Sequence, residues 1–303
     1  MQIDFLTADV FTAERFGGNP LAVVPHASGI PEELLLAVTR EFNYSETVFV
    51  YPPRDARHAR RVRIFTPGGE IPFAGHPTVG TAFALAHTGA IALTGDVTDI
   101  VLEEGVGPVA VRIRSSGGVP TTCQLSVAML PEETEPPVDA ATIADVLGLE
   151  PDDVLRGEFA PRAVSCGIPF LIVPVASGDA VRRARVRLDR WEGTLRGTTS
   201  SEILVFAQDA GAHDADLHAR VFVPGLNVPE DPATGSACAC LGGFLAARSA
   251  REGTLRWSVA QGMEMGRPSR LEVEADVSAR AVTAVRVGGA TVMVSEGWMR
   301  LRD

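Results

Sequence analysis

The chain has 303 residues, of which 46% are hydrophobic, and a formal net charge of −11. This acidic balance excludes a polyanion-binding surface, because nucleic-acid-binding proteins concentrate positive charge to displace the counterions around phosphates. All 27 basic residues are arginine, which excludes Schiff-base chemistry on lysine, a phosphate-loop lysine and a lysine general base.

In the first half of the chain, sequence patterns typical of strands alternate with patterns typical of helices. Helices are predicted over about 31–42, with a proline in the first turn, and over about 78–87. The serine- and glycine-rich residues 115–120 are predicted to form a linker. The apolar, β-rich runs predict strands that begin at Gln2 and that cover 21–24, 47–51, 62–65, 99–102 and 109–113.

The second half repeats this scheme, with predicted helices at about 140–149 and 234–248. Strands with few and short helices predict an α+β protein in which each domain wraps a sheet around a central helix. We expect two domains, 1–118 and 119–303. One alternative for the last strand, at about 290–303, is that it packs back onto the first domain.

The sequence also contains an internal repeat. Residues 63–72, RIFTPGGEIP, return as RVFVPGLNVP at 220–229, with a constant offset of 157 (220 − 63). Ser45-Glu46 is matched by Ser201-Glu202, and residues 18–25 are matched by 167–174. One repeat of this length predicts two similar domains, with the active site where the copies meet.

Two loops between a strand and a helix carry the candidate chemistry, FAGHPTVG at 73–80 and EDPATGSA at 230–237. The free amides of a helix's first turn carry a partial positive charge, so two such helix starts can bind an anion without lysine or arginine. Gly75 and Gly235 allow the backbone to approach a ligand closely, although both could serve only a tight turn. The expected ligand is a small carboxylate.

Three side chains are candidates for proton transfer. His76 and Asp231 lie in these two loops, and each could alternatively cap its helix. Glu46 precedes an apolar strand, so we expect partial desolvation to raise its pKa towards the range of a reversible acid and base. Its repeat mate Glu202 is an internal control. The alternative is that Glu46 is a plain surface acid.

Other kinds of site have little support. The histidines and aspartates of residues 213–218 are interpreted as a solvated loop rather than a metal site. The sequence contains neither a serine-hydrolase elbow nor a dinucleotide-binding fingerprint, so these two classes have little support. The N-terminal residues do not resemble a secretion signal, and no apolar run reaches the length of a membrane span, so we expect a cytoplasmic protein. The four cysteines, which we expect to be buried, are Cys123, Cys166, Cys238 and Cys240.

Six motifs occur in order along almost the whole chain: DVFT at 9–12 with GNPLAVV at 18–24, NYSET at 43–47, FTP at 65–67, GHPT at 75–78, EDPATGSA at 230–237 and QGMEMGRPS at 261–269. In this combination the chain resembles the PhzF-like phenazine-biosynthesis isomerase family. The resemblance implies the diaminopimelate-epimerase-like fold, a homodimer and cofactor-free chemistry. It also implies an activity similar to trans-2,3-dihydro-3-hydroxyanthranilate isomerase, which moves a proton from one ring carbon to another.

The resemblance also implies roles for individual residues. Glu46 corresponds to the family's acid and base. The catalytic set then includes His76 and Asp231, and the substrate-binding residues are Gly75, Gly235 and Ser236. Cys166 departs from the pattern, because a small hydroxyl residue is expected there.

Two alternatives remain at this stage. Amino-acid racemases and epimerases of the same fold use one cysteine in each helix-opening loop, and neither loop contains a cysteine here. A non-catalytic protein of the same fold, which binds a small acid or serves as a scaffold, is the alternative from another functional class.

Overall fold

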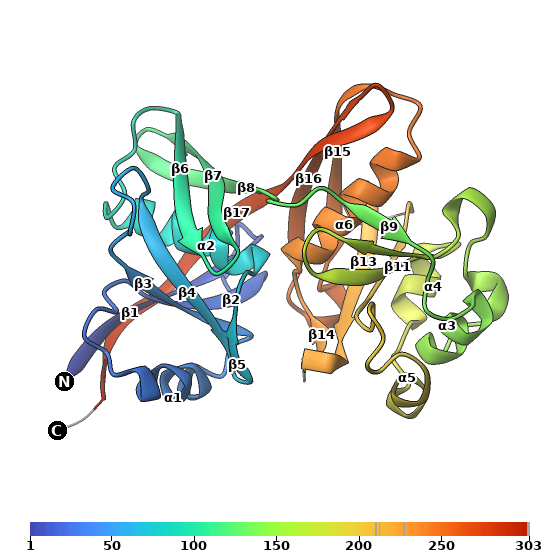
Figure 1. Ribbon diagram of the computed structural model, residues 1–303, viewed down its shortest axis with the longest axis horizontal. Coiled ribbons are helices and arrows are strands. Elements are labelled where there is room, and N and C mark those ends of the chain that lie inside the picture. The colour runs from blue at the N-terminus through green and yellow to red at the C-terminus, as the bar shows by residue number, and fades with distance from the viewer. Residues whose placement is uncertain (210, 212, 227, 302–303) are drawn as a thin grey trace. The chain divides into compact units, whose positions relative to one another are not determined.

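The computed structural model describes residues 1–209, 211, 213–226 and 228–301 (Figure 1). Asn227, which belongs to the second copy of the sequence repeat, lies outside the described residues. The chain divides into two compact units, one formed by Met1–Ala128 with Gly288–Asp303 and the other by Met129–Val287. The boundary therefore lies at residue 129 rather than at 119.

The strands of the first unit form a closed series of pairings. Starting from β17, the order is β1, β2, β3, β4, β6, β7 and β8, and β8 pairs again with β17. The β2–β3 and β4–β6 pairs are parallel. The strands are β1 (Gln2–Val10), β2 (Asn19–Val24), β3 (Glu46–Tyr51), β4 (Arg60–Thr66), β5 (Gly69–Ile71), β6 (Val97–Glu104), β7 (Gly107–Ser116), β8 (Val119–Ser126) and the part of β17 (Ala281–Arg300) from Gly288 onwards.

The helix α2 (Gly75–His87) is the centre of this unit and packs against β1, β2, β3, β7 and β8 (Figure 1). It is buried on every side from Gly75 to Ala86, as expected for a helix of small and apolar residues that lacks a polar face. A Cβ atom at Gly80 would lie 2.5 Å from Val10 Cγ2 and 2.6 Å from Leu21 Cδ2. Glycine at this position therefore permits the close approach of the helix to β1 and β2.

The helix α1 (Glu32–Phe42) is amphipathic and packs on β3 and β4 with the buried residues Leu35 and Val38. It ends at Asn43, which has a left-handed conformation (φ 52°) and donates its N–H to the Thr39 carbonyl. Asparagine tolerates this conformation better than most residues. The turn leads directly into β3, so the end of α1 fixes where the first residue of β3, Glu46, lies.

The prediction of a linker at residues 115–120 is wrong. These residues form the hairpin between β7 and β8, and Ser116 pairs with Val119. Gly117 and Gly118 have φ values of 59° and 78°, which matches the tight turn with two positive φ angles that joins antiparallel strands. A pair of glycines supports either a linker or this turn, and only the pairing of the flanking strands distinguishes them.

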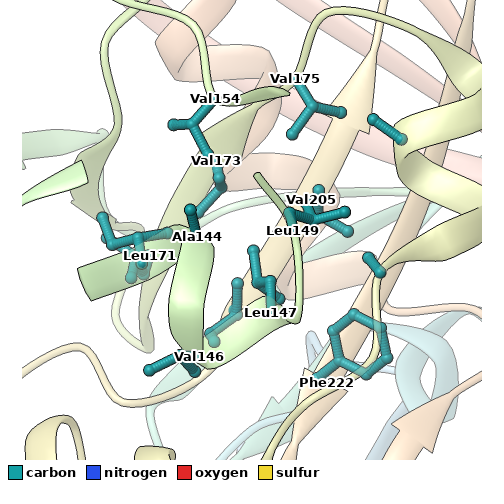
Figure 2. Packing of buried hydrophobic residues seen from close by; sticks show 14 of the residues in the cluster. Ala144, Val146, Leu147, Leu149, Val154, Leu171, Val173, Val175, Val205 and Phe222 are labelled. Atoms are coloured by element: carbon teal, nitrogen blue, oxygen red, sulfur yellow. The ribbon is translucent and has the colours of Figure 1, made fainter. Parts of the chain in front are cut away.

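The helix α6 (Gly235–Ala247) is the centre of the second unit and packs against β10, β11, β15 and β16. A separate apolar core lies between α3 and the sheet, where Leu147, Val173, Val205 and Phe222 meet (Figure 2). Its other helices are α3 (Ala140–Leu147), α4 (Gly178–Arg183) and α5 (Leu188–Thr194). Its strands are β9 (Glu132–Thr134), β10 (Arg162–Ser165), β11 (Pro169–Pro174), β12 (Ile203–Ala207), β13 (Leu217–Val223), β14 (Val228–Asp231), β15 (Gly253–Gln261) and β16 (Ser269–Ser278).

The two units share one pairing scheme. In the first, Thr47 of β3 pairs with Phe65 of β4, and in the second, Ile203 of β12 pairs with Phe222 of β13. The sequence repeat aligns these positions with each other. Each pair also continues into a parallel neighbour, β2 in the first unit and β11 in the second. The predicted α+β class, with a sheet wrapped around a central helix in each unit, is confirmed.

Candidate active site

Glu46 is held at the start of β3, where it pairs with Leu21 of β2. Its side chain is only 15% exposed, and its Oε2 atom lies 3.4 Å from Nε2 of His76. The interpretation of Glu46 as a plain surface acid is therefore wrong. A carboxyl group and an imidazole at this separation can share or exchange a proton through a small adjustment of either side chain.

His76 lies in the first turn of α2 and is 4% exposed. Burial lowers its pKa to about 3, although a backbone interaction with Pro20 opposes the shift. The imidazole is therefore neutral at physiological pH and has one ring hydrogen. The buried Asn19 Nδ2 atom lies 3.3 Å from His76 Nδ1. This contact holds the ring with Nε2 towards Glu46.

The alternative that His76 caps its helix is wrong. The N-cap of α2 is Ala74, in an extended conformation, and no side chain caps the helix. The amides of Gly75 and His76 belong to the first turn, where backbone N–H groups have no acceptor within the helix. This helix start therefore combines a glycine, amide donors and the Glu46–His76 pair.

In the second unit, Asp231 ends β14 and is 7% exposed. Thr234 donates its hydroxyl to Asp231 Oδ2 at 2.5 Å. Thr234, rather than Asp231, is the N-cap of α6, and no side chain caps this helix. The alternative of Asp231 as a helix cap is therefore also wrong. Gly235 and Ser236 are the first two residues of α6.

Gln261 organises this second loop and was not identified from the sequence as a functional residue. Its side chain is fully buried, donates to the Asp231 carbonyl at 2.8 Å and accepts from the Thr234 amide at 3.2 Å. The signal was present in the QGMEMGRPS motif, whose first residue it is. The structure thus brings Glu46, Gly75 and His76 together in the first unit, and it brings Asp231, Gly235 and Ser236 together in the second.

The arginines of the sequence repeat are structural in both units. Arg63 pairs with Glu32 and Glu70. Arg220 is buried, forms a bidentate pair with Glu230 and donates to backbone carbonyls at the end of α4 and at its C-cap, Ala184. Glu230, although it neighbours Asp231 in the sequence, therefore neutralises a buried arginine.

The interpretation of residues 213–218 as a solvated loop is only partly correct. Leu217 and His218 belong to β13 and are buried, and His218 Nε2 lies 3.1 Å from Glu264. Within the described part of the chain, no group of histidine, cysteine and acidic side chains has the arrangement of a metal site.

All four cysteines are buried, as predicted, and burial raises the pKa of Cys123 and Cys238. Of the helices in the described ranges, none has the length and apolar character that crossing a membrane requires.

Comparisons with known proteins bear on the family and the fold. The family described as phenazine biosynthesis-like protein matches residues 8–297. An uncharacterized isomerase of Mesorhizobium japonicum is 39% identical over 97% of both chains. The trans-2,3-dihydro-3-hydroxyanthranilate isomerase of Pseudomonas aeruginosa is 33% identical over 97% of this chain and 98% of its own. The crystal structure of a phenazine biosynthesis protein from Bacillus anthracis covers 99% of this chain and 100% of its own, with a TM-score of 0.89 and 24% identity.

Proposed function

Because the chain is an isomerase that belongs to the phenazine biosynthesis-like family, as its motifs predict, we propose that it moves a proton between two carbons of a small carboxylic acid without a cofactor. The relatives named trans-2,3-dihydro-3-hydroxyanthranilate isomerase support a cyclic amino acid of this kind as the substrate class. The proposed acid and base is Glu46.

The observation that carries the proposal is the 3.4 Å contact between Glu46 Oε2 and His76 Nε2. In the first step the Glu46 carboxylate accepts a proton from a substrate carbon, and the electron pair of the broken C–H bond is delocalised into the adjacent unsaturated system. In the second step the carboxylic acid returns this proton to another carbon, so that no atom is gained or lost. The neutral His76 imidazole orients the Glu46 carboxyl group between the two steps.

The substrate carboxylate is assigned to the amides of a helix start, at Gly75 and His76 or at Gly235 and Ser236. Fixed N–H groups at such a position stabilise both the carboxylate and the negative charge that develops when a carbon acid loses its proton. Asp231, held by Thr234, is assigned a role in proton transfer or substrate orientation. The expectation that both loops act on one ligand stays a prediction.

Three further expectations belong to this proposal. The matched strand registers of β3–β4 and β12–β13 support an internal duplication. A homodimer and a cytoplasmic location are expected, and sedimentation and cell fractionation test them. The buried contact between Glu46 and His76 favours an enzyme over the alternative of a non-catalytic binding protein.

The decisive experiment is the exchange of substrate hydrogen for solvent deuterium, with trans-2,3-dihydro-3-hydroxyanthranilate as the first probe and related cyclic amino acids as further probes. Isomerisation with deuterium incorporated at the carbon that gains the proton supports the mechanism. Isomerisation or exchange that persists unchanged in Glu46→Gln overturns it.

A further inference from the structure

Glu104, at the end of β6, is a buried carboxyl group that the mechanism above does not use. The residue is only 9% exposed, and its Oε1 atom lies 2.6 Å from the hydroxyl oxygen of Thr78. The same hydroxyl oxygen lies 2.7 Å from the carbonyl oxygen of Ala74. Ala74 is the N-cap of α2, and Thr78 lies one turn further along the helix.

The number of hydrogens available to these two contacts shows whether Glu104 is ionised. The Thr78 hydroxyl has one hydrogen but two short contacts to oxygen atoms, and the Ala74 carbonyl can only accept. If Glu104 were ionised, one of the two contacts would join two acceptors with no hydrogen between them. A protonated Glu104 resolves the conflict, because it donates to Thr78 and Thr78 donates to Ala74. The second oxygen, Oε2, is buried and has no hydrogen-bond partner among the described residues, which costs less for a neutral acid than for a carboxylate.

The residues after Glu104 also contact the segment that leads into α2. The Val106 N–H donates to the carbonyl of Pro72 at 3.1 Å. A Cβ atom at Gly105 would lie 2.7 Å from Pro72 Cα, so the two backbones are in direct contact. The end of β6 therefore holds both the segment that leads into α2, at Pro72, and the first turn of the helix, at Ala74 and Thr78.

We propose that Glu104, as a neutral carboxylic acid, is a positioning residue that fixes the first turn of α2 and thereby sets His76 against Glu46. This inference rests on the proposed function of Glu46 and His76. Glu104 touches neither residue in the described contacts, and it acts through Thr78 and the backbone of Ala74.

The surroundings favour the neutral form. Burial raises the pKa of Glu104 to about 8, although the Thr78 hydrogen bond opposes the shift. Arg63 is neutralised by Glu32 and Glu70, and Glu103 accepts the backbone amides of Arg54 and Asp55. The Arg61 guanidinium stacks on the Tyr51 ring at 4.4 Å, and α2 contributes the neutral His76 and Thr78. The charged side chains that line the same cavity of about 370 Å³ are Arg54, Arg61, Arg63, Glu70 and Glu103.

The first test measures the protonation state without any substrate. The unfolded chain loses the Glu104 proton near pH 4.5 and the folded chain loses it near 8, so the folded state binds one extra proton between these values. The Glu104 contribution to folding stability falls as the pH rises through this window, by about tenfold in the unfolding constant per pH unit, and below pH 6.5 the opposite contribution of His76 offsets it in the wild type. Glu104→Gln removes this dependence, whereas Asp99→Asn, on the same strand and paired with Arg112, retains it. A Glu104→Gln protein whose pH dependence between 5 and 8 equals that of the wild type overturns the proposal.

The second test separates positioning from a general loss of structure. Glutamine at position 104 keeps a donor for Thr78, whereas Glu104→Ala and Thr78→Val remove the hydrogen bond. We expect Glu104→Gln to keep kcat within about threefold of wild type and to lose the decline of kcat above pH 8, and the other two to lower kcat at least tenfold with little change in KM. Equal impairment of Glu104→Gln and Glu104→Ala in folded protein overturns this inference alone. Full activity of Glu46→Gln overturns the proposed function instead.

Discussion

The side-chain nitrogen of Asn19 lies 3.3 Å from Nδ1 of His76, although 57 residues separate them in the sequence. Asn19 opens β2 and His76 opens α2, so the contact joins the start of a strand to the start of the central helix. This contact holds the imidazole in the orientation that places Nε2 near Glu46.

Replacement of Glu46 by glutamine should abolish proton transfer and leave the fold intact, because the amide is nearly isosteric but cannot accept the proton. We expect a loss of about 10²- to 10⁴-fold in kcat. The matched control is Glu202→Gln, its repeat mate in the second unit. Near wild-type turnover in Glu46→Gln together with an inactive Glu202→Gln would reverse the assignment.

Removal of the Asn19 side chain should misorient His76. We expect Asn19→Ala to lower kcat by about 10- to 100-fold, since small errors in the placement of catalytic groups cost this much. Steady-state kinetics with circular dichroism at the same pH would distinguish this effect from unfolding. Unchanged kcat in a folded variant would show that the hydrogen bond has no catalytic role.

His76 should also make stability depend on pH. Its pKa is about 3 in the folded protein, compared with the ordinary value of 6.5, so the unfolded chain binds the extra proton between these values. The contribution of the neutral His76 to the free energy of unfolding is therefore fully present above pH 6.5. It is lost as the pH falls, by up to about 1.4 kcal/mol per pH unit. Urea unfolding of wild type and His76→Gln at pH 7 and pH 5 measures this difference, and parallel curves for the two proteins would contradict it.

Chelators and thiol-alkylating reagents should leave activity unchanged. The four cysteines are buried, and burial disfavours the reactive thiolate. An activity assay after incubation with EDTA, and separately with iodoacetamide, checks this expectation. Loss of turnover with EDTA would point to a metal in the reaction and would contradict the cofactor-free mechanism.

A side chain at Gly80 should destabilise the first unit. The Cβ atom of Gly80→Ala would meet Val10 and Leu21 at 2.5 and 2.6 Å, and overpacking of this kind costs about 1 to 3 kcal/mol. Gly193, in α5, has nothing near its Cβ position, so Gly193→Ala should be neutral or stabilising. Equilibrium unfolding compares the stabilities of the two variants. Equal stability would show that β1 and β2 can move to accommodate the methyl group without destabilising the protein.

Much of the site could be predicted from the sequence because its residues lie in short motifs. Glu46, His76 and Asp231 were identified from local signals, and the repeat indicated two similar units. Asn19 and Gln261 lie in two of these motifs but were missed, because their roles depend on contacts with distant segments. Glu104 was missed because an acidic pair before a glycine looks like an exposed turn, and only the packing of β6 on the helix start buries it.

The pairing of β1 with the end of β17 joins Gln2 to Arg300 and Val10 to Thr291. Strand β1 therefore lacks this partner until the chain has been synthesised as far as β17. During that time one edge of β1 is unpaired, and unpaired strand edges promote association with other chains. The sheet of the first unit therefore closes only after the residues of the second unit have been made.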